Sequence, residues 1–179
     1  MATDVATLRL EPSRYVSNCI AKIRLSAGAA VLDLACGSGR HAALVASTGC
    51  HVTAADIDPK RLTDVGQIPA SFRGDGTINT VRADGSGTLP FRDEGFDLVM
   101  IVHFVPPGII ANVTPLLRRG GHLLLETYGG HGENWRMLPE AGKLRRELKT
   151  EFDVLDYRER LVGPTKHEAA SVRFLARRR

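Results

Sequence analysis

The chain is poor in the residues that build disulfide frameworks and metal sites. It has three cysteines, Cys19, Cys36 and Cys50, with no C-x-x-C pair, and six histidines without metal-ligand spacing. An odd cysteine count without such a pair argues against a disulfide scaffold and a zinc site, and favours a reducing compartment. We therefore expect no metal centre and no disulfide.

Long apolar runs are also missing. No segment approaches the roughly 18 to 20 consecutive apolar residues of a membrane span, and no basic segment followed by an apolar one opens the chain as in a signal peptide. Hydrophobic residues still make up 43% of the sequence, enough for one core. The composition predicts a soluble, cytoplasmic protein with no membrane contact and a single domain, residues 1–179.

An excess of positive charge is confined to the C-terminal part of the chain. Residues 1–132 hold 12 basic and 12 acidic side chains, whereas residues 133–179 hold 12 and 8, for a formal net charge of +4. Three of the basic residues are Arg177, Arg178 and Arg179. Because no aromatic residues interleave these arginines, we favour a solvated, partly disordered basic tail at 177–179 over a nucleic-acid contact.

Segments whose apolar residues recur at helical spacing alternate along the chain with short apolar runs that are typical of strands. This alternation predicts an α/β fold with a mostly parallel sheet. Helices are expected from Ser13 to before residue 27, over 40–48, from Pro59 to about 69, over 109–117 with a kink or early end at Pro115, and through Leu144, Leu148 and Phe152. Gly120-Gly121 is expected to end the fourth of these helices. Strands are expected at 30–34, 52–57, 78–83, from Phe96 through 105, 122–128, 154–162 and 171–176. The last two follow each other without a helix, which predicts an antiparallel hairpin at the sheet edge.

A glycine-rich turn follows the first predicted strand in VLDLACGSGRHAAL, residues 31–44. Gly37 and Gly39 allow the main chain to approach a ligand closely, and Arg40 begins a helix whose free N–H groups face the same place. Asp56 ends the second strand close to the offset of about 20 residues at which a carboxylate accepts ribose hydroxyls. This combination suits two adenosine-containing cofactors, a nicotinamide dinucleotide and S-adenosylmethionine.

Three carboxylates at three strand ends favour the second cofactor. Asp33 would repel a pyrophosphate but attract a sulfonium and an ammonium; alternatively, it hydrogen-bonds its own turn. Asp84, followed by Gly85, is able to accept a hydrogen bond from an adenine amino group, although an ordinary turn aspartate fits equally well.

Five segments, VLDLACGSGRHA, VTAADIDP, VRADGSG, LPFRDEGFDLVMIVHF and RRGGHLLLET, resemble in this order the motifs of class I S-adenosylmethionine-dependent methyltransferases. The resemblance covers about residues 12–176. EPSRYV, ACGSGRH and ETYGGHGEN with LPEAGKL are most similar to small bacterial methyltransferases of the tellurite-resistance type, which act on small-molecule or inorganic acceptors.

The resemblance implies a Rossmann-like three-layer sandwich with a seven-stranded sheet of order 3-2-1-4-5-7-6, strand 7 antiparallel and helices on both faces. It also implies that Asp33 and the main chain of Ala35–Gly39 hold the methionine end, Asp56 the ribose, Ile57 the adenine ring and Asp84 the adenine amino group. The full expected set of cofactor-binding residues is Asp33, Ala35, Cys36, Gly37, Gly39, Arg40, Asp56, Ile57, Ala83, Asp84, Gly85 and Val102. Two departures stand out: Arg119 replaces a common proline, and Val102-His103 replaces a polar motif that many relatives carry after strand four.

The acceptor side is less determined by the sequence. Methyl transfer needs positioning and water exclusion more than bond activation by the protein. His103 and His131 are candidate bases, although a satisfied or solvated histidine fits each position equally well. Tyr15, His103, Phe104 and Tyr128 are expected to line the site, and the N-terminal helix within residues 1–26 to cover the cofactor.

A small-molecule acceptor is favoured because no insertion between strands adds surface for a macromolecule. Three alternatives remain open: an S-adenosylmethionine-binding module without turnover, an RNA methyltransferase, and an NAD-linked reductase, which Asp33 and the short chain disfavour. A monomer and a homodimer are equally compatible with the sequence.

Overall fold

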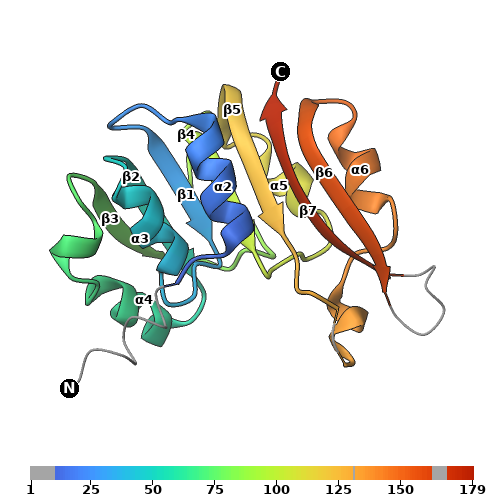
Figure 1. Cartoon of the computed structure of the whole chain (residues 1–179), viewed down its shortest axis with the longest axis horizontal. Coiled ribbons are helices and arrows are strands. Elements are labelled where there is room, and N and C mark those ends of the chain that lie inside the picture. The colour runs from blue at the N-terminus through green and yellow to red at the C-terminus, as the bar shows by residue number, and fades with distance from the viewer. Residues whose placement is uncertain (1–10, 131, 163–168) are drawn as a thin grey trace. The chain divides into compact units, whose positions relative to one another are not determined.

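The computed structural model describes residues 11–130, 132–162 and 169–179. Its seven strands form one sheet in the order β3-β2-β1-β4-β5-β7-β6 (Figure 1), which confirms the expected α/β class and strand order. The chain divides into two compact units, Met1–Gly85 and Ser86–Arg179. His131, one of the two candidate bases, lies outside the described residues.

The first unit contains a three-stranded parallel part of the sheet. Helix α2 (Arg14–Ile23) begins at Ser13, whose side chain accepts a hydrogen bond from the Tyr15 N–H, as the capping pattern predicts. The remaining elements are β1 (Ala30–Leu34), α3 (Arg40–Ala46), β2 (His51–Asp56), α4 (Pro59–Gly66), the 3₁₀ turn η1 (Ala70–Phe72) and β3 (Thr77–Arg82). Helix α3 packs on all three strands, and α4 packs on β2 and β3 (Figure 1).

Buried apolar side chains along β1 and β2 form the core of this unit. Val31, Leu32 and Leu34 are fully buried in β1, and so are the apolar residues of β2. Strands of a parallel sheet are covered on both faces, so they read as continuous apolar runs. Asp33 interrupts the β1 run and is itself only 1% exposed, so this charge requires a specific environment.

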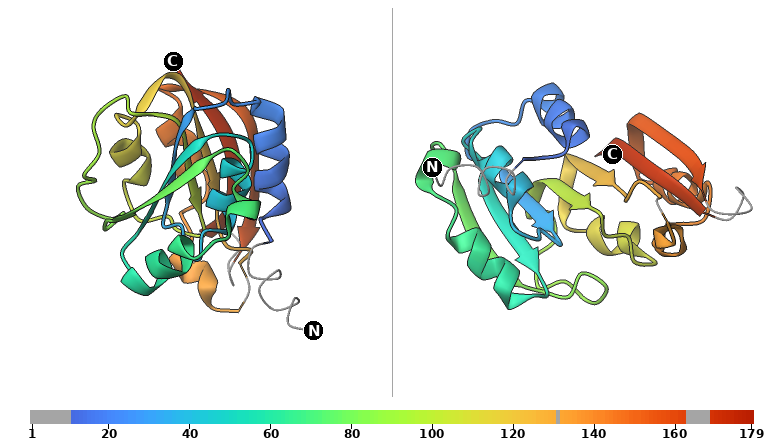
Figure 2. Two further views of the ribbon diagram at one scale, coloured as in Figure 1. Left: turned by 90° about the vertical axis from the view of Figure 1, so that its left-hand side faces the viewer. Right: turned by 60° about the horizontal axis from the view of Figure 1, so that its bottom comes forward.

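The second unit combines a parallel pair with an antiparallel hairpin. Strand β4 (Phe96–Val102) pairs in parallel with β5 (Leu117–Glu126), whereas β7 (Ala169–Arg178) pairs antiparallel with both β5 and β6 (Phe152–Val162). The orange β6 and the red β7 lie side by side in the right panel of Figure 2. The expected edge hairpin is therefore confirmed. Helix α5 (Ile109–Val113), the 3₁₀ turn η2 (Asn134–Met137) and α6 (Lys143–Leu148) complete the unit, and α6 packs on β6.

Some boundaries predicted from the sequence are wrong; β4, for example, ends at Val102 and not at residue 105. Gly120-Gly121 does not end a helix, because α5 already ends before Pro115 and the glycines lie inside β5, next to a register shift in the β4–β5 pair. A φ of +80° at Gly120 identifies an irregular strand position that favours glycine. Phe152 does not continue the last helix; it opens β6, and its buried side chain gave the helical pattern.

The C-terminal arginines are ordered parts of the sheet edge and not a disordered tail, although Arg177 and Arg179 are exposed. Arg177 Nε donates to the Gly120 carbonyl at 3.2 Å, and Arg179 Nε donates to Asp153 at 2.8 Å. Arg178, with a side chain only 13% exposed, donates to the Leu117 carbonyl and forms an ion pair with Glu94 at 3.6 Å. Strand β7 thus runs to Arg178, and these charges hold the end of the chain in the sheet.

Candidate functional site

The glycine turn after β1 has two glycines in different surroundings. Both have left-handed conformations, with φ of +55° at Gly37 and +80° at Gly39. A Cβ at Gly39 would lie 2.9 Å from Val65 and Ile68, whereas a Cβ at Gly37 would meet no atom within 4 Å. Gly39 is therefore required by close packing, and Gly37 leaves open space in front of the turn.

Asp56 ties this turn to the end of β2. Its Oδ2 accepts the Gly37 N–H at 2.9 Å, and its Oδ1 accepts the Asp58 N–H at 3.0 Å. Each carboxylate oxygen has further lone-pair capacity, so these bonds leave room for hydroxyl donors. The neighbouring Ile57 side chain is 57% exposed, which is unusual for an isoleucine beside a buried strand.

Asp33 caps helix α3 from inside the sheet. The N-cap residue of α3, Gly39, has no side chain to accept a hydrogen bond, and the main-chain N–H of Ala42 in the first turn bonds to the Asp33 carboxylate instead. Burial raises the pKa of Asp33 to about 7, against the opposing effects of the Ala42 N–H and of Arg40. Its buried Oδ2 accepts no hydrogen bond from the described residues.

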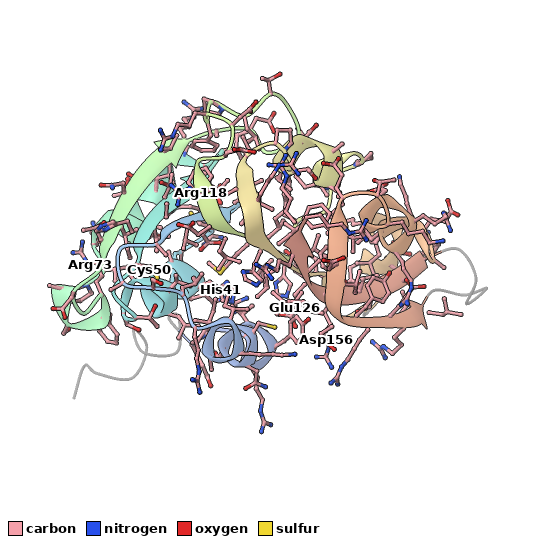
Figure 3. All side chains as sticks on the ribbon, turned by 90° about the horizontal axis from the view of Figure 1, so that it is seen from above. His41, Cys50, Arg73, Arg118, Glu126 and Asp156 are labelled. Carbon is pink, nitrogen blue, oxygen red and sulfur yellow. The ribbon has the colours of Figure 1, made fainter. Side chains whose placement is uncertain are left out.

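His41, which the sequence reasoning did not single out, links α3 to the start of α2. His41, labelled in Figure 3, is only 3% exposed. Its Nε2 accepts the Ser13 N–H at 3.1 Å. An accepting nitrogen carries no proton, so the ring is neutral in this arrangement. The N-terminal helix is thereby fixed to the helix that follows the glycine turn.

The other expected cofactor residues surround the ends of the same three strands. The Cys36 thiol is buried, which raises its pKa and keeps it neutral, so it is no nucleophile. After β3, Ala83 donates its N–H to the Asp56 carbonyl at 3.1 Å, and Asp84 is exposed. The structure therefore brings the residues after β1, β2 and β3 together; Val102 lies in the second unit, buried at the end of β4.

His103 follows β4 in a strained, well-held conformation. Its φ is +63°, rare for a residue other than glycine, and its N–H donates to the Glu126 carbonyl at 2.7 Å. The imidazole stacks on the Tyr128 ring, with 4.4 Å between centroids and 19° between planes. The ends of β4 and β5 are thus joined at this histidine.

A mostly apolar pocket of about 420 Å³ opens beside the His103–Tyr128 stack. Its lining includes Phe104, so three of the four expected acceptor-site residues lie together; Tyr15, on α2 of the first unit, is not among the lining residues. The remaining lining comes from the loop after β4 and from the segment through η2 to α6: Val105, Pro106, Pro107, Gly108, Thr127, Arg136, Met137, Leu138, Pro139, Glu140, Lys143, Leu144 and Glu147.

A second pocket, of about 350 Å³, is strongly basic and was missed by the sequence reasoning. It shares His103 and Thr127 with the first pocket. Arg158 and Arg160 of β6 and Arg173 of β7 line it, and Glu126, labelled in Figure 3, is the one acidic residue in its lining. The alternating R-E-R of residues 158–160 was a sequence signal for this basic face.

The described residues contain neither a metal cluster nor a membrane-spanning helix. No cluster of three or more histidine, cysteine, aspartate or glutamate side chains is arranged to hold a metal ion within residues 11–130, 132–162 and 169–179. Over the same ranges, no helix has the length and apolar character needed to cross a membrane.

Residues 31–121 match a family model described as a methyltransferase domain. A demethylmenaquinone methyltransferase of Clavibacter sepedonicus is 43% identical over 75 residues, 42% of this chain and 29% of that protein. A protein of the same name from Tropheryma whipplei (strain Twist) is 30% identical over 128 residues, 69% of this chain and 52% of that protein. The chain thus spans about half, or less, of the length of these relatives.

Solved structures share the fold at lower identity. A SAM-dependent methyltransferase from Methanosarcina mazei has a TM-score of 0.67 at 20% identity, covering 89% of this chain and 96% of that one. TehB from Haemophilus influenzae has a TM-score of 0.69 at 19% identity, covering 94% of this chain and 63% of that one. At such identities the likeness establishes the fold alone.

Proposed function

Because the chain belongs to the class I S-adenosylmethionine-dependent methyltransferases, we propose that it transfers a methyl group from S-adenosylmethionine to a small organic acceptor. The observation that carries this proposal is Asp33, a buried carboxylate with an unpartnered oxygen at the glycine turn. A bound cation would favour the ionised form of this carboxylate and supply the missing partner of its Oδ2.

The residues of the first unit fit the proposed cofactor. Asp33 would attract the ammonium of the methionine part, and the open space at Gly37 leaves room for close main-chain approach. Asp56 has lone pairs left for the ribose hydroxyls, and the exposed Ile57 offers an apolar surface to the adenine. When bound, the cofactor supplies a methyl carbon already activated by its sulfonium.

The protein's own part in the reaction is to position the acceptor and to exclude water. The 420 Å³ pocket beside His103 and Tyr128 is lined mainly by apolar side chains and is large enough for a small aromatic molecule. Curated relatives are named as methyltransferases of demethylmenaquinone, an organic acceptor. The His103 ring, held by its stack on Tyr128, is the candidate group for receiving a proton from the acceptor.

A calorimetric titration with S-adenosylmethionine, S-adenosylhomocysteine and NAD tests the proposal. We expect the first two to bind and NAD not to bind. Asp56→Ala should lose about 1 to 3 kcal/mol of S-adenosylhomocysteine affinity, because the ribose hydroxyls lose their acceptor. Thermal unfolding of the variant, measured in parallel, separates this loss from the loss of the Gly37 and Asp58 hydrogen bonds.

Turnover is tested separately with isotope-labelled S-adenosylmethionine and a panel of hydroxylated aromatic acceptors. Absence of S-adenosylhomocysteine binding would overturn the cofactor assignment. Binding without transfer to any acceptor would favour a binding module over an enzyme.

A further inference from the structure

Three arginines of the β6–β7 hairpin converge on one face of the sheet. Arg158 of β6 lies directly opposite Arg173 of β7, which in turn lies opposite Glu126 of β5. Residues that pair across strands point to the same face, and so do residues two apart along a strand. Arg160, opposite Ser171, therefore joins the same row, and all five residues line the 350 Å³ pocket.

The charges of this row do not cancel. Glu126 is the one acid lining the pocket, against three arginines. Arg158 is 66% exposed and reaches Asp156 only at 3.8 Å, a long ion pair that leaves most of its N–H groups available. Arg160 donates to the Gly129 carbonyl, which holds its guanidinium at the pocket while using one of its two terminal nitrogens.

The basic pocket is continuous in its lining with the apolar one. His103 and Thr127 belong to both. A ligand whose apolar part occupies the 420 Å³ pocket can therefore place a charged group among the arginines. We propose that Arg158, Arg160 and Arg173 form a subsite for an anionic group, a carboxylate or a phosphate, carried by the small organic acceptor.

This proposal rests on the proposed function, because it takes the ligand to be the methyl acceptor. Its test measures binding and does not require turnover. The probes are 2-naphthoate, its neutral isostere 2-naphthamide, and inorganic phosphate, each titrated into the full chain at pH 7.5 and low salt. We expect 2-naphthoate to bind at least tenfold more tightly than 2-naphthamide, because charge-assisted bonds to guanidinium are the strong ones. We expect phosphate alone to bind more weakly than 2-naphthoate, because it leaves the apolar pocket empty.

The preference for 2-naphthoate over 2-naphthamide should fall in Arg158→Gln. It should fall further, to twofold or less, in the double variant Arg158→Gln/Arg160→Gln. Arg145→Gln is the matched control. Arg145 packs over the Tyr157 ring at 5.0 Å, and Tyr157, as the neighbour of Arg158 in the strand, points to the opposite face of the hairpin. This control removes the same charge near the same strand and should keep the preference.

Folding of each variant is checked by thermal unfolding and by S-adenosylhomocysteine affinity, which should match the parent chain. Equal affinity for 2-naphthoate and 2-naphthamide, or a preference that survives the double substitution in a folded protein, would overturn the subsite. If phosphate bound as tightly as 2-naphthoate, the proposal that the anionic group is carried by an organic acceptor would be wrong. Anion-selective binding in a chain that binds no S-adenosylhomocysteine would leave the subsite standing while the proposed function fails.

Discussion

The hydrogen bond of Asp33 to its own turn does not exclude the proposed contact with the cofactor. Asp33 hydrogen-bonds its own turn, through the Ala42 N–H, and it also keeps a buried oxygen without a donor from the described residues. Burial makes the ionised form costly, which is why the pKa rises to about 7 from an ordinary value of 3.8.

The raised pKa of Asp33 has a measurable consequence for stability. Between about pH 4 and pH 7 the folded state keeps the proton that the unfolded state has lost, so the contribution of Asp33 to stability falls as pH rises through this window. We expect Asp33→Asn, which cannot titrate, to lack this fall, which is on the order of a few kcal/mol. Urea unfolding of both proteins without cofactor, at four pH values from 4.5 to 7.5, measures it. If the free energy of unfolding changed with pH in the same way in both proteins, the raised pKa of Asp33 would be contradicted.

At the level of elements, the strand–turn–helix unit of β1 and α3 is determined by two glycines with different tasks. Gly39 sits against α4, with no space for a side chain, whereas Gly37 faces open space. The spacing of the glycines in the sequence predicted the turn correctly. It did not predict which glycine packing requires, because that depends on Val65 and Ile68 of a later segment.

Gly39→Ala and Gly37→Ala should therefore differ in their effects. Both substitutions place alanine at a left-handed φ, which costs roughly 1 to 2 kcal/mol. Gly39→Ala should lose a further 1 to 3 kcal/mol or so by overpacking against Val65 and Ile68. Gly37→Ala should instead lower S-adenosylhomocysteine affinity by more than tenfold while remaining the more stable variant.

Denaturant unfolding and calorimetry on the two alanine variants measure both effects, each protein serving as the control for the other. Equal destabilisation by both substitutions would show that the contacts at Gly39 do not matter. An unchanged S-adenosylhomocysteine affinity in Gly37→Ala would show that the cofactor does not occupy the space beside Gly37.

At the scale of the whole molecule, the two proposed ligand sites rest on separate sets of elements. All but one of the expected cofactor residues belong to Met1–Gly85, and both pockets are lined by residues of Ser86–Arg179. A ligand that binds the folded state slows local opening of the segments that it contacts. The two ligands should therefore leave different footprints in hydrogen exchange.

We expect S-adenosylhomocysteine to protect the amides of residues 33–40 and 56–58, and 2-naphthoate to protect residues 103–108 and 126–129. Hydrogen exchange with mass spectrometry, with each ligand alone, gives this map. As a reference, the amides of β3, such as Thr80, should change little with 2-naphthoate. A footprint of 2-naphthoate confined to residues 33–58 would place it in the proposed cofactor site and contradict the separation.

What the sequence by itself determined was the order and class of the elements. Each strand carries its own apolar run and each turn its own glycine or proline, so β1, β2 and the β6–β7 hairpin were predictable from local pattern. The match of residues 31–121 to the methyltransferase family follows from the same local motifs. Local signals failed where a distant partner decides the outcome, as at Gly120-Gly121 inside β5.

The tertiary structure alone decided which charges are buried, paired or gathered. Arg177, Arg178 and Arg179 read as a tail because their partners, Gly120, Glu94 and Asp153, are far away in the chain. The basic pocket likewise exists only because strand register sets Arg158 opposite Arg173. A charge acquires its role from its neighbours in space, through burial and hydrogen bonding, and no local pattern records those neighbours.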